Sequence, residues 1–373
     1  MIGTITINPS IDQHMAIDKL VKDDAIRVHE ISRFPGGKGI NVSRVIKELG
    51  GETVAFSVAG GCAGYMLKSL LSDHKIPCQM IDVLEETRIN VIITDKSDRT
   101  QTRLHADGPF ASLDVTDQLF SRVSGYEPLP EWWVLGGSLP PGAPTDFYAR
   151  FIQFFKDAGV KCFLDADNDA LKLGIEAKPY FIKPNEYEMS RLAGHALPDE
   201  ASIIDAAYEI ISGGVEVVAV TRGPKGALFI TKESVLRAKS PDIETKSKVG
   251  AGDSFLAGCV LALSRGETMG EALRLGMAAG TAAVMHEGTS LCRREDVEKI
   301  VSQIIIENVE RKSQPLVRTS IQKKLDVVCG MQVDPSLAPF EASYEGEEFR
   351  FCSLKCEERF LKDPKRYTKN GVR

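Results

Sequence analysis

The chain has 373 residues, which is long for one hydrophobic core, so we expect one large domain and a smaller addition. Hydrophobic residues make up 43% of it, while a net charge of −6 and a pI near 5.7 argue against general binding to nucleic acids or anionic membranes. Residues 1–7 lack the basic region and long apolar run of a signal peptide, and no apolar stretch approaches the ~20 residues of a transmembrane helix. A cytoplasmic protein is therefore expected. Five scattered cysteines would then be buried thiols in a reducing compartment: Cys62, Cys78, Cys162, Cys259 and Cys292.

Short β-rich runs alternate with helical periodicity over the first 308 residues. This alternation is typical of a sheet covered by helices on both faces. Strands are predicted at residues 1–7, 53–59, 132–135, 160–165, 180–183, 215–221 and 227–231. Helices are predicted at residues 40–49, 145–157, 186–192, 203–212, 254–264 and 269–286.

Two regions do not follow this alternation of strands and helices. In them, polar and apolar residues alternate with period two, at residues 27–34 and again at 88–94 and 100–105. Such alternation indicates strands with two different faces, which do not belong in a buried parallel sheet. Arg27, Arg88 and Arg103 lie in these segments, and arginine can bind phosphate oxygens in a bidentate manner. The alternative for each arginine alone is a solvated surface charge.

A Gly-Gly-Lys-Gly stretch at residues 36–39 precedes the first predicted helix. Glycine permits the close approach of a polar ligand, and Asn41 offers paired donor and acceptor groups to sugar hydroxyls. Lys38 is a cation inside this turn, which suits a phosphate already carried by the substrate.

Residues 249–254 are the most informative stretch of the sequence. Gly250 and Gly252 let the backbone turn so tightly that consecutive N–H groups point at one spot, and the following helix adds the positive end of its dipole. Asp253 lies at the mouth of this anion hole, where a carboxylate can take a proton from an alcohol as phosphate arrives. The alternative is an ordinary glycine turn with an aspartate as helix cap.

Together with the N-terminal segment at residues 8–12, these motifs resemble the ribokinase-like (PfkB) family of carbohydrate kinases over about residues 1–308. The resemblance implies an α/β fold, a ribokinase-like three-layer α/β/α sandwich with a small β-sheet lid from about residues 13–34 and 86–106. We expect this sugar-phosphate kinase domain to span residues 1–310. In the family the lid covers the sugar and often builds a dimer interface, so a homodimer through the β-lid is expected.

The resemblance also implies roles for individual residues. Asp253 is the expected base, and Gly250, Ala251 and Gly252 would stabilise the moving phosphoryl group. The substrate-binding residues would be Asp12, Arg27, Gly37, Lys38, Asn41, Arg88, Arg103 and Ser138. The ATP-binding residues would be Lys183, Asn185, Thr221, Gly223, Gly226 and Ser254.

Asn185 and Glu188 lie three residues apart at a predicted helix start and share one face. In the family this pair organises Mg²⁺ and its waters near the triphosphate. The alternative is a capping box, and the two roles are compatible.

The small residues at 278–283 can receive an adenine ring or simply pack against another helix.

The three lid arginines and the glycine- and proline-rich residues 136–142 resemble the phosphosugar branch of the family. Lys38 and the Gly-Gly-Lys-Gly stretch favour phosphorylation of fructose 1-phosphate to fructose 1,6-bisphosphate, as in 1-phosphofructokinases and tagatose-6-phosphate kinases. Fructose 6-phosphate is the close alternative, because Arg27, Arg103 and residues 288–292 also fit minor 6-phosphofructokinases. A non-catalytic sugar-phosphate sensor that signals through the tail is disfavoured, since Asp253 and its glycines are intact.

Residues 311–324 contain five basic residues, one proline and no acid, which is linker composition. Residues 325–373 differ and resemble the YHS domain, a small module of metal-handling proteins. Cys352 and Cys356 would share a helix face with Cys329 alongside, and three thiolates suit Zn²⁺ or Cu⁺. A fourth ligand would come from water, an acid or a partner. The alternative is a metal-free interaction module.

Overall fold

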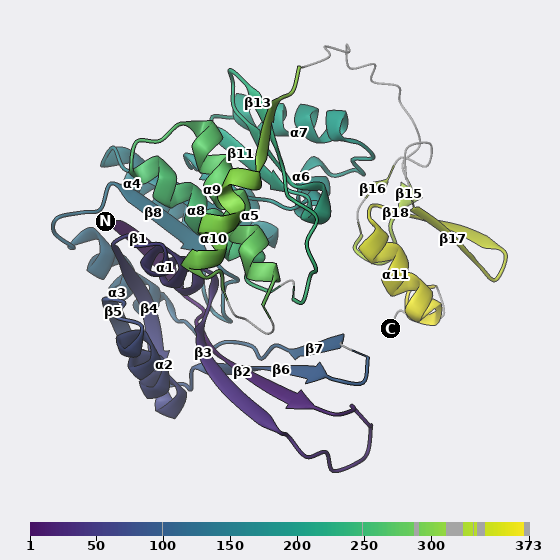
Figure 1. The fold of residues 1–373 in the computed structure, drawn as a ribbon, viewed down its shortest axis with the longest axis horizontal. Coiled ribbons are helices and arrows are strands. Elements are labelled where there is room, and N and C mark those ends of the chain that lie inside the picture. Colours follow the sequence, from purple (N-terminus) through teal and green to yellow (C-terminus); the bar gives the residue numbers. More distant parts are fainter. Residues whose placement is uncertain are drawn as a thin grey trace.

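The computed structural model describes residues 1–98, 100–247, 249–286, 291–310, 324–330, 332–333 and 340–368. Most of the expected linker, residues 311–323, and residues 288–290 lie outside this set. Figure 1 shows a central sheet between helices, a second sheet below it, and a small C-terminal module to one side. The expected three-layer α/β/α sandwich with a lid is therefore confirmed.

The central sheet has ten strands. Their bounds are β1 Ile2–Thr6, β4 Thr53–Gly60, β5 Cys78–Val83, β8 Trp132–Gly136, β9 Lys161–Asp165, β10 Phe181–Ile182, β11 Val217–Thr221, β12 Ala227–Ile230, β13 Val235–Lys239 and β14 Ile305–Asn308. The strand order is β14-β13-β12-β11-β10-β9-β8-β1-β4-β5. Strands from β5 to β11 run parallel, and β11 to β14 run antiparallel. The parallel strands bring their carboxyl ends to one edge, where ligands of such sheets bind.

Helices cover both faces of this sheet (Figure 1). One face packs against α3 Leu113–Ser124, α4 Phe147–Asp157, α5 Asn168–Glu176, α6 Glu186–Ala193 and α7 Glu200–Ser212. The other face packs against α1 Lys38–Glu48, α2 Gly61–Asp73, α8 Ala251–Ser264, α9 Met269–Val284 and α10 Arg294–Ile300. Consecutive strand residues alternate between the two cores, as the pleat requires: Trp133 belongs to the first core and Val134 to the second.

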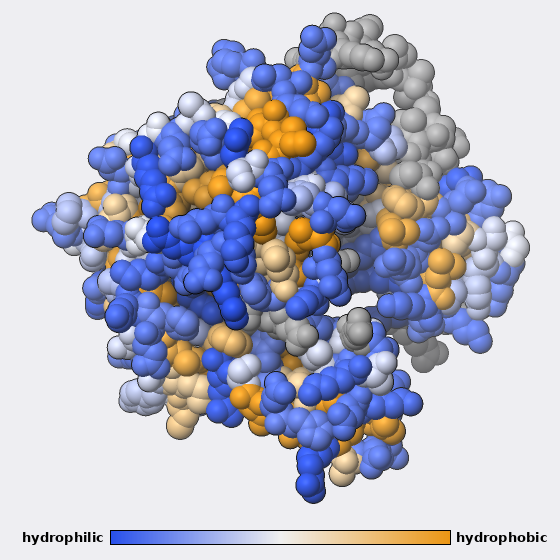
Figure 2. Space-filling model, viewed as in Figure 1, coloured by the Kyte–Doolittle hydropathy of each residue, from blue (hydrophilic) through white to orange (hydrophobic). Residues whose placement is uncertain are grey.

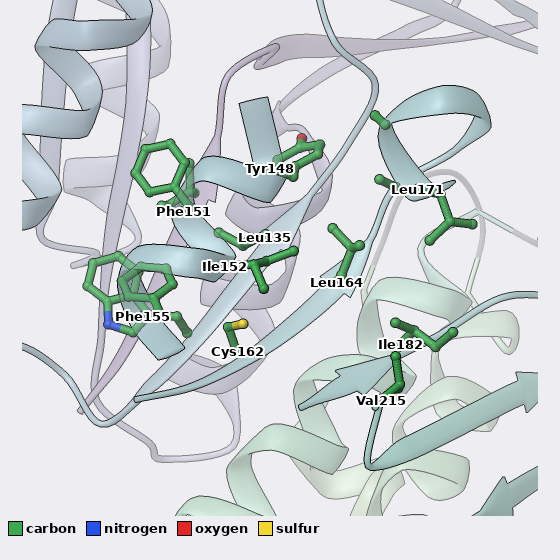
Figure 3. Close-up of a cluster of buried hydrophobic side chains, with 14 of the residues drawn as sticks. Leu135, Tyr148, Phe151, Ile152, Phe155, Cys162, Leu164, Leu171, Ile182 and Val215 are labelled. Atoms are coloured by element: carbon green, nitrogen blue, oxygen red, sulfur yellow. The ribbon is translucent and has the colours of Figure 1, made fainter. Parts of the chain in front are cut away.

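Helix α4 illustrates how the sequence positions these layers. Three of its five buried residues, Phe147, Phe151 and Phe155, recur every four positions and form one apolar stripe. Phe155 stacks on Trp133 of β8 with ring centroids 4.7 Å apart. Figure 3 shows Phe151 and Phe155 of this helix on the side of the sheet that carries Leu135 of β8 and Cys162 of β9. This contact packs α4 against β8.

The lid is a four-stranded sheet in the order β3-β2-β6-β7. Its strands are β2 Ser10–Ile17, β3 Glu30–Gly36, β6 Arg88–Asp95 and β7 Thr100–Leu104. The period-two segments at residues 88–94 and 100–105 are confirmed as strands. The segment predicted at 27–34 begins three residues later, so Arg27 is not in the lid strand and is exposed before it.

The other predicted strands and helices are also present, with ends that shift by a few residues. No separate strand or helix was predicted at β5, β13, β14, α2, α3, α5 or α10, and β2 was predicted only as part of the lid range of residues 13–34. One further expectation is wrong: Cys62 is exposed on α2, and Cys78 is only partly buried. None of the eight cysteines forms a disulfide within the described residues.

The C-terminal module contains β15 Lys324–Leu325, β16 Gln332–Val333, β17 Phe340–Tyr344, β18 Glu347–Phe351 and α11 Leu354–Lys362. A small core lies between them, built from Val333, Phe351, Cys352, Cys356 and Phe360. The surface in Figure 2 is largely hydrophilic, with scattered small hydrophobic groups. No helix among the described residues is long and apolar enough to cross a membrane.

Candidate active site

The carboxyl ends of β9 and β10 place an ion-paired cluster at the centre of the sheet edge. Asp165, the last residue of β9, has a side chain only 1% exposed. One of its oxygens accepts a hydrogen bond from Lys38 Nζ at 2.8 Å, and the other lies 3.2 Å from Lys183 Nζ. Sequence reasoning missed Asp165. The available signal was an acid at the C-terminal end of a predicted parallel strand.

Asp253 lies in the first turn of α8, as expected. Gly250 precedes this helix with φ of 75°, a left-handed conformation that glycine adopts without strain. The N–H groups of Ala251, Gly252 and Asp253 begin the helix, so they have no acceptor within it. A Cβ atom on Gly252 would lie 3.4 Å from Lys183 Nζ, so this lysine borders the predicted anion hole.

Asn41 of α1 forms a hydrogen bond to Asp253. Its Nδ2 donates to Asp253 Oδ2 at 2.8 Å, and its Oδ1 accepts from Arg44 at 3.2 Å. Asn41, a predicted substrate-binding residue, and Asp253, the predicted base, are 212 residues apart in the chain but are in direct contact.

The two carboxylates have opposite electrostatic environments. Burial, and then the charge of Asp165, raise the pKa of Asp253 above its usual value, although Lys38, Asn41 and Lys183 oppose this. Burial would also raise the pKa of Asp165, but Lys183 and Lys38 outweigh it and lower that pKa. The environment of Asp165 therefore favours its anion, whereas that of Asp253 favours proton binding more than in an ordinary aspartate.

Lys38 differs from its sequence-based interpretation. Burial acts to lower its pKa, but the charges of Asp165 and Glu188, with a smaller effect of Asp253, outweigh it and raise that pKa. Its ammonium group thus points to the carboxylates at the sheet edge. This contact does not indicate that Lys38 pairs with a phosphate already on the sugar.

The candidate sugar pocket lies where the lid joins the central sheet. Asp12 Oδ1 accepts hydrogen bonds from Ser10 Oγ at 2.8 Å and from Asn90 Nδ2 at 2.9 Å. A Cβ atom on Gly36 would come within 2.7 Å of the same oxygen, so glycine is required for this approach. Gly37, with φ of 111°, begins α1 directly beside it.

The strand register assigns the lid residues to two faces. Paired residues share a face, so Asp12, Asn90 and Phe34 lie together, and so do His14, Ile92 and Arg103. Asp12 and His14 are two residues apart along β2, so both sets of paired residues lie on the same face of the lid. Ser10 is on that face too, and Arg88, which pairs with it, therefore shares the face. Asp12, Arg88 and Arg103, three of the predicted substrate-binding residues, therefore lie on one face of the lid.

The individual contacts of these residues differ. Arg88 donates to the carbonyl oxygens of Asn8, Pro9 and Ala106, so it holds the N-terminal turn as well as lining the lid face. Arg103 is exposed on that face. Ser138 accepts a hydrogen bond from Asn8 Nδ2 at 3.3 Å and so lies at the same turn.

A cavity of about 890 Å³ separates this lid face from the loop that leads to α8. His14 and Phe34 line it from the lid, and residues 244–246 line it from the other side. The lid thus stands away from the loop at residues 244–246, with room for a polar ligand between them.

The predicted ATP residues occupy the neighbouring strand ends. Asn185 and Glu188 form a complete capping box, with both hydrogen bonds at 2.9 Å. Asn185 forms a parallel bridge with Thr221, and Gly223 and Gly226 follow in a tight turn with positive φ. Ser254 is fully buried beside Cys292, so the ATP-binding role predicted for its hydroxyl is not supported. The small residues of α9 pack against α8, with Gly280 close to Phe255, which favours the helix-packing interpretation.

A second cluster of chemically active groups lies in the C-terminal module. The Sγ atom of Cys352 lies 3.5 Å from that of Cys329 and 3.7 Å from that of Cys356. Asp326 is adjacent, and the four ligand atoms lie within 4.8 Å of one another. Asp326 was not predicted. It also accepts hydrogen bonds from the backbone of Val328 and Cys352, which fixes its carboxylate against the thiols.

Comparisons with known proteins agree with both parts of the chain. Residues 2–296 match the model of the pfkB family of carbohydrate kinases, and residues 325–370 match that of the YHS domain. The ATP-dependent 6-phosphofructokinase isozyme 2 of Escherichia coli is 33% identical over 305 residues, which cover 81% of this chain and 98% of that protein. The 1-phosphofructokinase of Bacillus subtilis and the tagatose-6-phosphate kinase of Staphylococcus epidermidis are each 30% identical, over 82% of this chain and 98% of each protein.

Solved structures are similar over the same region. Phosphofructokinase-2 from Escherichia coli, in complex with substrates and products, aligns with a TM-score of 0.78 at 33% identity, over 81% of this chain and 98% of that one. A ribokinase from Thermotoga maritima aligns with a TM-score of 0.66 at 21% identity, over 81% and 99%, which supports the ribokinase-like fold alone.

Proposed function

The chain belongs to the pfkB family of carbohydrate kinases and is an ATP-dependent sugar-phosphate kinase, and we propose that its acceptor is fructose 1-phosphate. The observation that carries the mechanism is the arrangement around Asp253. This carboxylate lies at the N-terminus of α8, is bonded by Asn41, and has Lys183 beside the same helix start. A base and a set of anion-stabilising groups are thereby close together.

In the proposed reaction, Asp253 accepts the proton of the acceptor hydroxyl while that oxygen forms a bond to the γ-phosphorus of ATP. The bond from this phosphorus to the oxygen bridging to ADP breaks, and ADP leaves with the electron pair. The N–H groups of residues 250–252 and the ammonium groups of Lys38 and Lys183 stabilise the transferring charge. Asp165 keeps both lysines at the sheet edge through the ion pairs described above.

The family implies Mg²⁺ as well as ATP. The carboxylate of Glu188 and the amide oxygen of Asn185 are hard ligands of the kind that Mg²⁺ accepts through its bound waters. Glu188 keeps one carboxylate oxygen outside the capping box, so a capping and a metal role are compatible. When bound, Mg²⁺ would neutralise charge on the triphosphate. Thr221, Gly223 and Gly226 are proposed to lie along the nucleotide.

The acceptor is argued from the sugar side of the site. The Gly-Gly-Lys-Gly stretch resembles 1-phosphofructokinases and tagatose-6-phosphate kinases, and the lid face carrying Arg88 and Arg103 suits a phosphorylated sugar. Fructose 6-phosphate is the second candidate, because the 6-phosphofructokinase isozyme is 33% identical and the 1-phosphofructokinase 30%. This small difference in identity does not separate the acceptors.

An ATP-coupled assay with four acceptors tests the acceptor assignment. Fructose 1-phosphate, fructose 6-phosphate, tagatose 6-phosphate and free fructose would be compared by kcat/KM. We expect the highest value for fructose 1-phosphate and the lowest for free fructose. A preference for fructose 6-phosphate would select the second candidate, and a preference for free fructose would contradict the phosphosugar assignment.

We also propose a homodimer formed through the outer face of the lid. The register places Ile31, Leu104 and Ile89 on the face opposite to Asp12, and all three are at least 40% exposed. Apolar side chains gathered on one exposed sheet face favour association. A structure of Escherichia coli phosphofructokinase-2 is described as a tetrameric inhibited form, which shows that a relative forms oligomers. A monomer in light scattering would contradict this proposal.

For the C-terminal module we propose a site for Zn²⁺ or another thiophilic metal. A tetrahedral zinc site with Zn–S bonds of about 2.3 Å has S···S edges of about 3.8 Å. The observed separations of 3.5 and 3.7 Å are close to this edge. Asp326 would supply the fourth ligand that the three cysteines lack. Metal analysis of the full chain should find one equivalent, and a variant with all three cysteines changed to serine should have none. The reduced thiols fit a cytoplasmic location, which we propose as well.

A further inference from the structure

The C-terminal module contacts the kinase domain at one aromatic side chain. Tyr187 of α6 packs against the module's core cluster, which contains Cys329, Cys352 and Cys356. Lys355, next to Cys356 in α11, has its Nζ 5.8 Å from the centre of the Tyr187 ring. Figure 1 shows the module beside α6. The thiol cluster therefore lies against the kinase domain instead of facing only solvent.

The position of Tyr187 links this contact to the nucleotide side of the active site. It lies in the first turn of α6 between Asn185 and Glu188, the two residues of the capping box. Glu188 in turn acts electrostatically on Lys38, which is bonded to Asp165. A change in the contact between the module and Tyr187 would therefore act on Asn185 and Glu188, the proposed Mg²⁺-nucleotide residues, which lie within one helical turn of Tyr187.

Geometry makes this contact depend on the metal. Two cations face the Tyr187 ring, Lys355 from the module and Arg191 from α6, the latter at 5.9 Å. A bound metal would join two segments of the module, because Asp326 and Cys329 come from one and Cys352 and Cys356 from the other, and the four ligand atoms lie within 4.8 Å of one another. Without metal, this link between the segments is absent. The loaded site therefore holds α11 and its Lys355 in place against Tyr187 and keeps the module on α6.

We propose that the first turn of α6 is the docking surface of the C-terminal module, and that metal occupancy of the module tightens Mg²⁺-ATP binding through Tyr187. This inference rests on the kinase activity and the metal site proposed above, and it adds a coupling between them. A cation–π contact at a partly exposed site is worth ~0.5–1 kcal/mol, so the KM for Mg²⁺-ATP should fall about two- to five-fold on loading.

The test uses the full chain, loaded with zinc or stripped of it and returned to excess Mg²⁺. Two readouts are taken: the KM for Mg²⁺-ATP, and amide hydrogen exchange of residues 186–193. Zinc should lower both the KM and the exchange rate in the unaltered protein. Tyr187→Ala and Lys355→Glu should bind zinc in the same amount but lose both responses. Tyr65→Ala is the matched control, because Tyr65 also lies on a helix surface under a lysine, Lys68 at 5.9 Å, and should keep both.

The outcomes separate this coupling from the functions on which it rests. If the chain binds zinc and is an active kinase, but neither the KM for Mg²⁺-ATP nor the amide exchange rate responds to zinc, the coupling alone is wrong. Responses that persist in Tyr187→Ala would overturn the role of that residue as the contact. A chain that takes up no zinc would overturn the metal site and the coupling together, and an inactive chain would overturn the kinase assignment.

Discussion

At the scale of single residues, two aspartates in one polar cluster differ in their tendency to bind a proton because their neighbours differ. Asp165 is surrounded by two ammonium groups and stays ionised, whereas Asp253 is buried near that negative charge and binds a proton more readily. A base must exchange protons, so the second environment fits catalysis and the first fits positioning of the lysines.

Asp253→Asn should preserve the fold and nucleotide binding but lower turnover by ~100-fold or more, within the range for losing a general base. Asparagine keeps a hydrogen-bonding group toward Asn41 but cannot accept the hydroxyl proton. Steady-state kinetics and nucleotide binding of the purified variant check this. Near-normal turnover would mean that Asp253 acts only as a helix cap.

Asp165→Asn should move the acid limb of the kcat/KM profile to lower pH. A base loses activity as pH falls through its pKa, and the Asp165 charge contributes to the raised pKa of Asp253. Removing that charge lowers this pKa, so the base stays ionised in more acidic solution. Maximum turnover should fall as well, because Lys38 and Lys183 lose their shared partner. An acid limb that stays in place or moves to higher pH would contradict this electrostatic account.

At the scale of elements, the lid shows how a two-residue period separates two functions on one small sheet. One face carries Asp12, Arg88 and Arg103 together with His14 and Phe34, which line the cavity, and the other face carries exposed apolar residues. A one-residue slip in register would exchange the two faces. The strand pairing therefore determines which arginines can reach a ligand.

Arg103→Ala should raise the KM for the sugar phosphate about ten-fold or more, with little change in the KM for ATP, because a charge-assisted contact typically contributes ~1.5–3 kcal/mol. Arg33→Ala is the matched control: Arg33 pairs with Gln13 on the opposite face of the lid. Equal effects of the two substitutions, measured with both substrates, would contradict the assignment of the inner face to the sugar phosphate.

The sequence predicted the elements and motifs whose chemistry is local, such as the period-two lid segments and the glycine turn before α8. It also predicted that Asn41 and Asp253 belong to one site, through the family's order of motifs. It did not predict the partner of Lys38, because Asp165 is 127 residues away and nothing local to Lys38 indicates that pairing. Asp326 and Tyr187 were missed for the same reason: each acquires its role only when distant segments pack together.

At the scale of the whole molecule, a kinase domain and a small cysteine-containing module share one chain. The proposed sugar, ATP and Mg²⁺ residues all lie before residue 310, and every proposed tail ligand lies after residue 325. The two parts meet at Tyr187, outside the sugar pocket. This division favours a catalytic unit that is complete by itself and a module that adjusts it.

A chain that ends at residue 310 should therefore fold and keep kinase activity. Its KM for Mg²⁺-ATP should equal that of the zinc-free full chain, because both lack the loaded module on α6. Circular dichroism and steady-state kinetics of the shortened chain test this. A folded but inactive product would mean that the module contributes directly to the active site or to the dimer.

The most direct test of the central claim is ³¹P NMR of a reaction containing the purified protein, Mg²⁺-ATP and fructose 1-phosphate. Transfer to the sugar predicts a second phosphate ester resonance, on C6, that grows in step with ADP and is nearly absent with Asp253→Asn. ADP that accumulates with inorganic phosphate, and with no new sugar ester from any ketohexose phosphate, would contradict the account.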